Sequence, residues 1–257
     1  MLRIEHLTKV YPNGTVGLRD VSFEVEDGEF LVVIGLSGSG KSTLLRCINR
    51  LIEPTEGKIF WDDTDLTAAS AAEMRRIRRH IGMVFQQFNL VKRSSVLTNV
   101  LSGRLGYVNP WLSLLGWWPS EEHERARRAL ERVGIAEKAA SRADALSGGQ
   151  QQRVGIARAL MQEPRLLLAD EPVASLDPVL AHSILHYLEM LNKTDGTTVV
   201  CSLHFLDLVH RYATRVVGLK DGLKVFEGHP TDIDRARFKE IYGEEAQEVR
   251  ATALDAA

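Results

Sequence analysis

The sequence predicts an α/β fold in which a parallel sheet follows an N-terminal β region and is interrupted by a helical insert. The opening residues alternate apolar and polar side chains, which is typical of half-buried strands. Two later runs, "FLVVIG" and "RLLLAD", are apolar enough to form strands that are buried on both faces. Between these runs, residues from about 88 to 163 have mostly helical patterns. These observations place a helical segment inside an α/β core.

Composition restricts the class of protein. The chain has 257 residues, of which 44% are hydrophobic and 26% are charged, so it can bury a full core. The formal net charge of −2 gives no overall attraction to nucleic acid, and we expect no nucleic-acid partner. Cys47 and Cys201 lie far apart without metal-ligand spacing, so we expect both to be core residues in a reducing compartment. The absence of a signal-peptide pattern and of a long apolar run predicts a cytosolic chain that does not itself span a membrane.

The N-terminal part is expected to form strands followed by a glycine-rich loop. The stretches "LRIEHLTKVY" and "VSFEVEDGEF" alternate apolar and polar residues around glycine and aspartate turns. The stretch "GLSGSGKS" at 35–42 then follows an apolar strand and precedes the helix-like "STLLRCINRL". Glycines let successive backbone N–H groups point inward, and the helix N-terminus adds partial positive charge. The stretch therefore predicts a loop that binds a polyphosphate.

Side chains of this loop suit a nucleoside triphosphate with its magnesium ion. Lys41 supplies a positive charge for the outer phosphates, and Ser42 supplies a hydroxyl for Mg²⁺. The expected nucleotide-binding residues of the loop are Gly35, Ser37, Gly38, Ser39, Gly40, Lys41, Ser42 and Thr43.

The expected helical insert contains the most unusual segment of the sequence. The stretch "SGRLGYVNPWLSLLGWWPSEEHERA" at 102–126 holds three of the four tryptophans. Such an apolar segment forms either part of the insert's own core or a docking surface for another protein. Its second half continues as "SEEHERARRALERVGI", where Glu121 and Glu122 fit the first turn of a helix.

A second glycine-led helix start occurs in "LSGGQQQR" at 146–153. Ser147 is a good N-cap for a helix that continues toward Pro164. Gly148 and Gly149 leave backbone N–H groups bare at the positive end of the helix, which makes a second anion site. Because the first loop already holds the phosphates of this chain, we expect the second site to contact a nucleotide bound by another copy.

The strand predicted for "RLLLAD" ends in two carboxylates. Asp170 and Glu171 follow the apolar run directly, and in an open α/β sheet ligands bind at the carboxyl ends of the strands. We expect Asp170 to face the water shell of the magnesium ion and Glu171 to orient and deprotonate an attacking water. A further buried strand, "TTVVCSL", follows and leads to His204.

This series of motifs resembles one family along nearly the whole chain. In order, the motifs are "GLSGSGKS", "VFQQ", "LSGGQQQR", "LLLADEP", "SLDP" and the isolated His204. The order is similar to that of the nucleotide-binding subunits of ATP-binding cassette (ABC) transporters. The resemblance implies a P-loop NTPase core of the RecA-like type, with an N-terminal antiparallel β subdomain and an inserted α-helical subdomain. It implies one ABC ATPase domain at 1–257, divided into 1–87 and 164–240 (β subdomain and P-loop core), 88–163 (helical subdomain) and 241–257 (C-terminal tail).

The resemblance further implies a head-to-tail homodimer that binds two ATP molecules with Mg²⁺. Each ATP would lie between the phosphate loop of one copy and the "LSGGQ" helix of the other. The residues implied to act across the dimer are Ser147, Gly148, Gly149, Gln150 and Asp177.

Further residues acquire roles from the resemblance. Tyr11 resembles the aromatic residue that stacks on adenine, and His204 resembles the histidine that contacts the γ-phosphate. Gln86 resembles the glutamine that reaches Mg²⁺ and the attacking water, with Gln87 as the alternative because the glutamine is doubled. The implied catalytic residues are Glu171, His204 and Lys41, and the implied metal-site residues are Ser42, Gln86 and Asp170.

The branch of the family is predicted from the organisation of the chain and from the insert. A lone cassette without a fused membrane domain is typical of a bacterial importer subunit. The insert, including "FNLVKRSSVLTNVLSGRLGY", resembles that of phosphonate importer ATPases. The expected partners are therefore two integral membrane permease subunits and, indirectly, a periplasmic or extracellular solute-binding protein, at the cytoplasmic face of the inner membrane. The resemblance implies an ATPase that powers import of phosphonate or another phosphorus oxyanion. Two alternatives remain open: an importer for polar amino acids or another small solute, and a soluble cassette that acts on ribosomes or DNA repair complexes.

Overall fold

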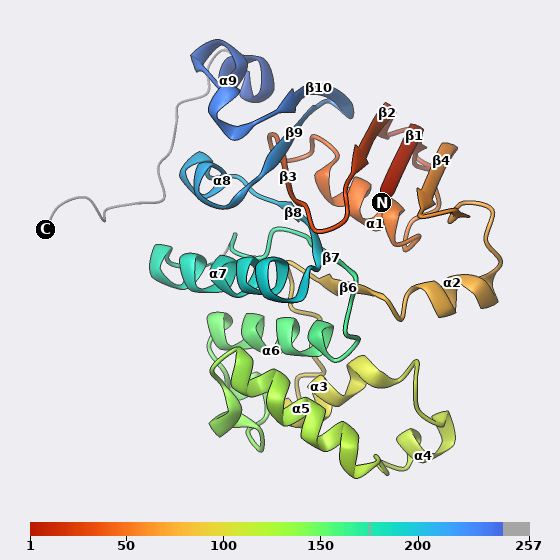
Figure 1. Ribbon diagram of the computed structural model, residues 1–257, viewed down its shortest axis with the longest axis vertical. Helices are drawn as coiled ribbons and strands as arrows, with labels where there is room; N and C mark the ends of the chain where they lie inside the picture. The colour runs from red at the N-terminus through yellow and green to blue at the C-terminus, as the bar shows by residue number, and fades with distance from the viewer. Residues whose placement is uncertain (175, 244–257) are drawn as a thin grey trace, which may run out of the picture.

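Two sheets organise the computed structural model, which describes residues 1–174 and 176–243 (Figure 1). The first sheet is antiparallel, with strand order β2-β1-β4-β5. Its strands are β1 (Leu2–Val10), β2 (Val16–Val25), β4 (Glu56–Trp61) and β5 (Thr64–Asp65). This sheet confirms the antiparallel β region expected at the N-terminus.

The second sheet carries the core and has the strand order β10-β9-β3-β8-β7-β6. Only β10 runs antiparallel to its neighbour, whereas the other strands pair in parallel. The strands are β3 (Phe30–Ile34), β6 (Ile81–Val84), β7 (Leu166–Ala169), β8 (Thr198–Ser202), β9 (Arg215–Lys220) and β10 (Leu223–Gly228). Because β3, β8, β7 and β6 are parallel neighbours, their carboxyl ends meet at one edge of the sheet.

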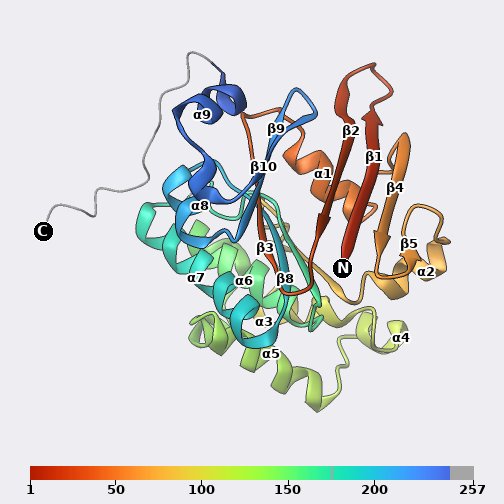
Figure 2. The ribbon, with the colours of Figure 1, turned by 45° about the horizontal axis from the view of Figure 1, so that its top comes forward.

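Helices pack against both faces of the parallel sheet, and the helices inserted between β6 and β7 lie at the bottom of the view in Figure 1 (Figures 1 and 2). The helices of the core are α1 (Lys41–Ile48), α2 (Ala71–Ile77), α7 (Pro178–Asp195), α8 (Leu206–Tyr212) and α9 (Arg235–Tyr242). Between β6 and β7 lie α3 (Val96–Leu101), α4 (Pro110–Leu114), α5 (Ser120–Arg132) and α6 (Gly148–Leu160). Short 3₁₀ helices occur at Ser102–Arg104, Ala136–Lys138, Ala143–Ala145 and Pro230–Asp232. The expected helical segment between the two apolar strands is thus observed.

The parallel sheet is buried on both faces, as its apolar strands predict. Along β3, Leu31 and Val33 pack into a cluster shared with α1 and the antiparallel sheet. Their neighbours Phe30, Val32 and Ile34 face the opposite cluster, which the helices α3, α5, α6, α7 and α8 complete. This alternation follows the two-residue period of a strand. It fixes the strand ends, and hence the loops that follow them, in a rigid frame.

Two further expectations concern the burial of the cysteines and the position of the C-terminal tail. Cys47 and Cys201 are both buried core residues, as expected. Helix α9 continues to Tyr242, so residues Ile241 and Tyr242 of the expected tail are helical and buried. The rest of that tail, at 244–257, lies outside the described residues.

No helix within residues 1–174 and 176–243 is both long enough and apolar enough to cross a membrane.

Candidate functional site

The loop between β3 and α1 is shaped by glycines that no other residue could replace without strain. Gly35 has φ 144°, and a Cβ atom there would lie 2.2 Å from the carbonyl oxygen of Leu219. Gly40 has φ 108°, and its Cβ would lie 2.4 Å from the carbonyl oxygen of Gly17. Both positions therefore need glycine, because L side chains avoid this backbone region and have no space. The loop can then turn sharply into α1, whose first residue is Lys41.

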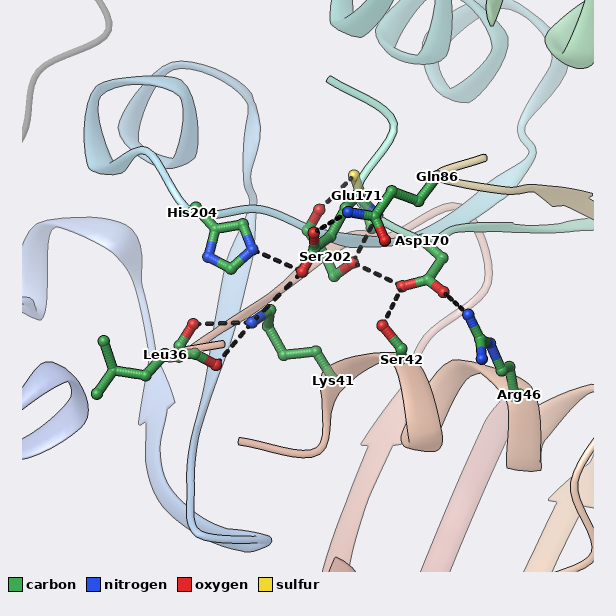
Figure 3. Close-up of polar contacts among 11 residues, drawn as sticks. Leu36, Lys41, Ser42, Arg46, Gln86, Asp170, Glu171, Ser202 and His204 are labelled. Carbon is green, nitrogen blue, oxygen red and sulfur yellow. Dashed lines mark hydrogen bonds and ion pairs between the residues drawn. The ribbon is translucent and has the colours of Figure 1, made fainter. Parts of the chain in front are cut away.

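Lys41 is held inside this loop. Its side chain is almost fully buried, and Nζ donates hydrogen bonds to the carbonyl oxygens of Gly35 (2.8 Å) and Leu36 (2.9 Å). Nζ also lies 3.7 Å from Oε1 of Glu171. Burial lowers the pKa of Lys41, and the charge of Glu171 acts in the opposite direction. The ammonium group is thus fixed at the centre of the loop (Figure 3).

Asp170 forms the second group of contacts at this edge. It is fully buried, and its Oδ1 accepts a 2.7 Å hydrogen bond from the hydroxyl of Ser42. Its Oδ2 accepts a 3.2 Å hydrogen bond from Arg46, which balances the buried negative charge. A hydroxyl and a carboxylate are hard oxygen donors, which fits Mg²⁺ that takes its other ligands from phosphates and water. Within the described residues, no group of three or more His, Cys, Asp and Glu could hold a metal ion by itself.

Glu171 lies where three strand ends converge. Its Oε2 accepts a 2.9 Å hydrogen bond from Gln86, which follows β6, and its Oε1 lies 2.6 Å from Nε2 of His204, which follows β8. The hydrogen bond with His204 is the largest cause that holds the pKa of Glu171 below its usual value, while burial opposes the shift and the charge of Lys41 supports it. Glu171 is therefore an ionised carboxylate held by partners from two other strand ends.

The backbone of Glu171 is strained. Its φ of 46° is in the left-handed region, which costs an L-residue about 1–3 kcal/mol. Such a conformation persists only where surrounding contacts hold it. The hydroxyl of Ser202 accepts a 2.8 Å hydrogen bond from the Glu171 N–H and lies 3.5 Å from Oδ1 of Asp170. One side chain at the end of β8 thus contacts both the backbone of Glu171 and the carboxylate of Asp170.

A cavity of about 340 Å³ opens in front of these residues. Tyr11 lines one side of it, and its hydroxyl lies 2.9 Å from the hydroxyl of Thr43. The lining residues are Tyr11, Thr15, Val16, Gly17, Ser37, Gly38, Gly40, Lys41, Ser42, Thr43, Gln86 and Glu171. Among the expected nucleotide residues of the loop, Gly35 and Ser39 shape the turn without lining the cavity. A cavity with a lysine, hydroxyls and an aromatic ring suits a nucleotide with its phosphates.

The predicted second anion site does not line this cavity. At the start of α6, Ser147 and Gln150 form a capping box, in which each side chain accepts a hydrogen bond from the other's backbone N–H. Gly148 is exposed, whereas Gly149 packs against Leu180 of α7. Asp177 is exposed and accepts a 3.0 Å hydrogen bond from the Leu180 N–H as the N-cap of α7. Gln87 does not line the cavity either, so the contacts favour Gln86 of the doubled pair.

Comparison with known proteins identifies the family. A family model described as "ABC transporter" matches residues 18–174, which is more than half of the chain. The chain belongs to the ABC transporter family.

Named relatives of this ABC protein match it over almost its whole length. It is 56% identical over 250 residues to the phosphonates import ATP-binding protein PhnC of Bdellovibrio bacteriovorus, covering 97% of this chain and 96% of the relative. It is 53% identical over 248 residues to PhnC of Shouchella clausii, covering 96% of this chain and 93% of the relative.

Solved structures agree with the ABC fold. The dimeric ATP-binding cassette MJ0796 in a post-hydrolysis state, bound to ADP and Pi, has a TM-score of 0.81 and 36% identity, covering 90% of this chain and 99% of that one. The cassette cbiO1 of Clostridium perfringens, part of the ABC transporter complex cbiONQ, has a TM-score of 0.79 and 30% identity, covering 93% and 92%. These neighbours confirm the P-loop NTPase fold that the motifs implied.

The apolar segment of the ABC helical insert is exposed. Trp111, Leu114, Leu115 and Trp117 are each at least 72% exposed, and Leu112 is 46% exposed. Among the described side chains of 111–118, Trp118 alone packs against the main core cluster. For Trp111–Trp117 the structure therefore excludes the alternative of an internal core piece.

Sequence reasoning missed three residues of the ABC site. Arg46 lies one helical turn after Ser42, a spacing that places both on one face of α1. Ser202 ends the strand that leads to His204, and its hydroxyl contacts the backbone N–H of Glu171 and the carboxylate of Asp170. Arg158 contacts the segment after Gln86, and no local signal joins residues that lie 70 positions apart.

Proposed function

We propose that this protein is the ATP-hydrolysing subunit of a phosphonate importer. The observation that carries the ATPase activity is the convergence of Lys41, Ser42, Asp170, Glu171 and His204 at one sheet edge. Two PhnC relatives with 53–56% identity over almost the whole chain support phosphonate, or a related phosphorus oxyanion, as the cargo. The same relatives favour this cargo over polar amino acids, and an importer over a soluble cassette.

In this proposal, residues of the cavity bind MgATP. The backbone of 35–40 and Lys41 receive the phosphates, and Tyr11 stacks on the adenine. Ser42 and Gln86 would hold Mg²⁺, with Asp170 behind Ser42 in its water shell. The bound ion would neutralise charge that develops on the phosphates.

Glu171 is proposed as the general base. Its lowered pKa keeps it ionised at neutral pH, so it can accept a proton from the attacking water. Gln86 and His204 hold its two oxygens in place, and His204 is also positioned to reach the γ-phosphate. A positioned base contributes about 10²- to 10⁴-fold, so Glu171→Gln is expected to bind ATP normally but to hydrolyse it at least ~10²-fold more slowly.

The start of α6 is proposed to complete the site of a second copy. Ser147, Gly148, Gly149, Gln150 and Asp177 do not line the cavity of their own chain, although the first four lie at the positive end of α6. MJ0796, a 36% identical cassette, is dimeric. A head-to-tail homodimer would therefore place two ATP molecules between the two chains.

The exposed segment Trp111–Trp117 is proposed to contact the membrane subunits. Its large apolar side chains are unusually exposed, and such patches mark interaction sites. The chain would be a peripheral subunit at the cytoplasmic face of the inner membrane, bound to two permease subunits that receive solute from a binding protein.

Growth tests the cargo directly. A deletion strain that carries the wild-type chain is expected to grow on a phosphonate as its only phosphorus source, whereas the Glu171→Gln strain is not. Both strains are expected to grow on phosphate, which controls for general toxicity. If the deletion strain grew on phosphonate as well as the wild type, the proposed cargo would be wrong.

A further inference from the structure

The segment that follows β6 has an unusual backbone. Gln86 contacts Glu171 at the start of the segment, and two residues later Phe88 and Asn89 have φ values of 56° and 49°. Consecutive non-glycine residues in the left-handed region persist only when surrounding contacts hold them. The segment Gln86–Asn89 therefore depends on a tertiary contact.

Arg158 of α6 supplies this contact. Its guanidinium donates one hydrogen bond to the carbonyl oxygen of Phe88 (2.8 Å) and one to that of Asn89 (2.5 Å). Burial lowers the pKa of Arg158, and within the described residues no carboxylate forms an ion pair with it. Among the described residues, this half-buried cation is compensated by two carbonyl oxygens and no carboxylate, which costs stability. The guanidinium donates to the two carbonyls from two separate nitrogens in a fixed planar geometry, whereas a lysine would have to reach both from one nitrogen on a flexible stem.

The same segment also lies close to α6 at two of its glycines. A Cβ atom at Gly148 would lie 3.8 Å from the ring of Phe88, and one at Gly155 would lie 3.8 Å from the Phe88 carbonyl oxygen. The Phe88 ring therefore lies over the first turn of α6, while Arg158 holds its carbonyl further along the helix. The segment is attached to α6 at two points.

These contacts connect Gln86, in the ATP cavity of the chain, to α6, whose start is proposed to contact the ATP of the second copy. We propose that Arg158 is a positioning residue that makes the segment Gln86–Asn89 and helix α6 move together. A displacement of Gln86 in the chain's own ATP cavity would then shift Ser147 and Gly148, which face the ATP of the second copy. This inference rests on the proposed dimer, and it assigns to Arg158 the cooperativity between its two ATP sites.

The test compares two arginines of the same helix. Arg158→Met keeps an unbranched apolar stem but removes the guanidinium with its fork and its charge, and we expect it to lower the Hill coefficient of ATP hydrolysis from about 2 toward 1. We also expect kcat to fall about 2- to 30-fold, the range for altered coupling. The affinity of the monomeric chain for MgATP is expected to stay within about twofold, because Arg158 does not line the cavity.

Arg153→Met is the matched control. Arg153 also donates to backbone carbonyls, those of Val133 and Gly134, but it does not contact Gln86–Asn89. We expect this variant to keep the wild-type Hill coefficient. If Arg158→Met does not fold, Arg158→Lys keeps the charge without the fork and takes its place, with an intermediate loss of cooperativity.

The possible outcomes separate this inference from the proposed function. Wild-type cooperativity in Arg158→Met, or in Arg158→Lys where that variant is used, would overturn the inference and leave the dimer intact. An equal loss in Arg153→Met would also overturn it, since any disturbance of α6 would then suffice. A wild-type Hill coefficient of 1 would contradict the paired sites themselves, and this inference with them.

Discussion

The start of α1 is enclosed, whereas the start of α6 is open to solvent, although glycines precede or begin both helices. At α1, Lys41 is only 3% exposed and lies beside the carboxylate of Glu171, which follows strand β7. At α6, Gly148 is exposed, and Ser147 and Gln150 cap each other. Both helix ends attract anions for the same electrostatic reason. In the proposed dimer, this difference means that one chain builds one complete phosphate site and contributes half of another.

The largest effect is expected when the positive charge of Lys41 at the start of α1 is removed. Lys41→Ala is expected to abolish productive ATP binding, because no other described cation lines the cavity. Titration with MgATP measures the loss, and a thermal unfolding curve confirms the fold. If Lys41→Ala bound ATP with wild-type affinity, the assignment of the cavity would be wrong.

A negative charge at the start of α6 should leave ATP binding by the monomer unchanged but slow ATP hydrolysis. Gly148→Asp has space, since the nearest contact of an added Cβ is an ordinary 3.8 Å, and an acidic residue at this end stabilises the helix by about 0.3–1 kcal/mol. We expect it to repel the partner's phosphates and to lower kcat about 10- to 100-fold, with affinity of the monomer unchanged. Gly148→Asn, which has the same shape without the charge, is the control and should lose much less. An equal loss in both variants would contradict the electrostatic explanation.

Changes in the exposed segment Trp111–Trp117, which lies in and directly after α4, should affect neither the start of α1 nor the start of α6. Leu114→Ser with Trp117→Ser alters side chains that are 77% and 72% exposed, so the change in unfolding free energy is expected to stay within about 0.5 kcal/mol for each. The ATPase of the isolated chain should be largely intact, while phosphonate-dependent growth should weaken. A clear drop in melting temperature together with the ATPase would instead indicate that these side chains support the fold.

The smallest expected effect is a pH dependence of stability that arises from Glu171, beside the start of α1. The pKa of Glu171 is lowered in the folded chain, so its contribution to stability is present above the unfolded value near 4.5 and is lost as the pH falls through the folded value. The stability difference between wild type and Glu171→Gln should therefore shrink below about pH 4.5, as urea unfolding can measure. Gly148→Asn changes no titratable group, so its stability effect should not vary with pH in that window. A difference for Glu171→Gln that stayed constant with pH would contradict the lowered pKa.

Much of the enclosed site could be predicted from the sequence. The motif at 35–42 and the apolar strand before Asp170 carry local signals, because loop geometry and strand burial depend on nearby residues. The contacts of Glu171 with Gln86 and His204 required the parallel order of β6, β7 and β8, which the sequence does not state. The left-handed φ of Glu171 leaves no sequence pattern at all.

The open regions were harder to predict. The segment Trp111–Trp117 has the composition of a core, so composition alone allowed either burial or docking, and only the structure shows its exposure. In the sequence, Arg158 is indistinguishable from any other arginine on the polar face of an amphipathic helix. Its contact with Phe88 and Asn89 depends on how the insert packs against the strand end.

Sedimentation of Glu171→Gln tests most directly whether the two helix starts meet on one ATP. With saturating MgATP this variant is expected to form a dimer, and without nucleotide it is expected to stay largely monomeric, because the phosphates bridge two positive helix ends. Adding Gly148→Asp to the same chain should return it to monomers. Mixing that double variant with Lys41→Ala should restore one intact site, and hence a heterodimer with one ATP per two chains. A Glu171→Gln chain that stayed monomeric with MgATP, or that dimerised equally with Gly148→Asp present, would contradict the account.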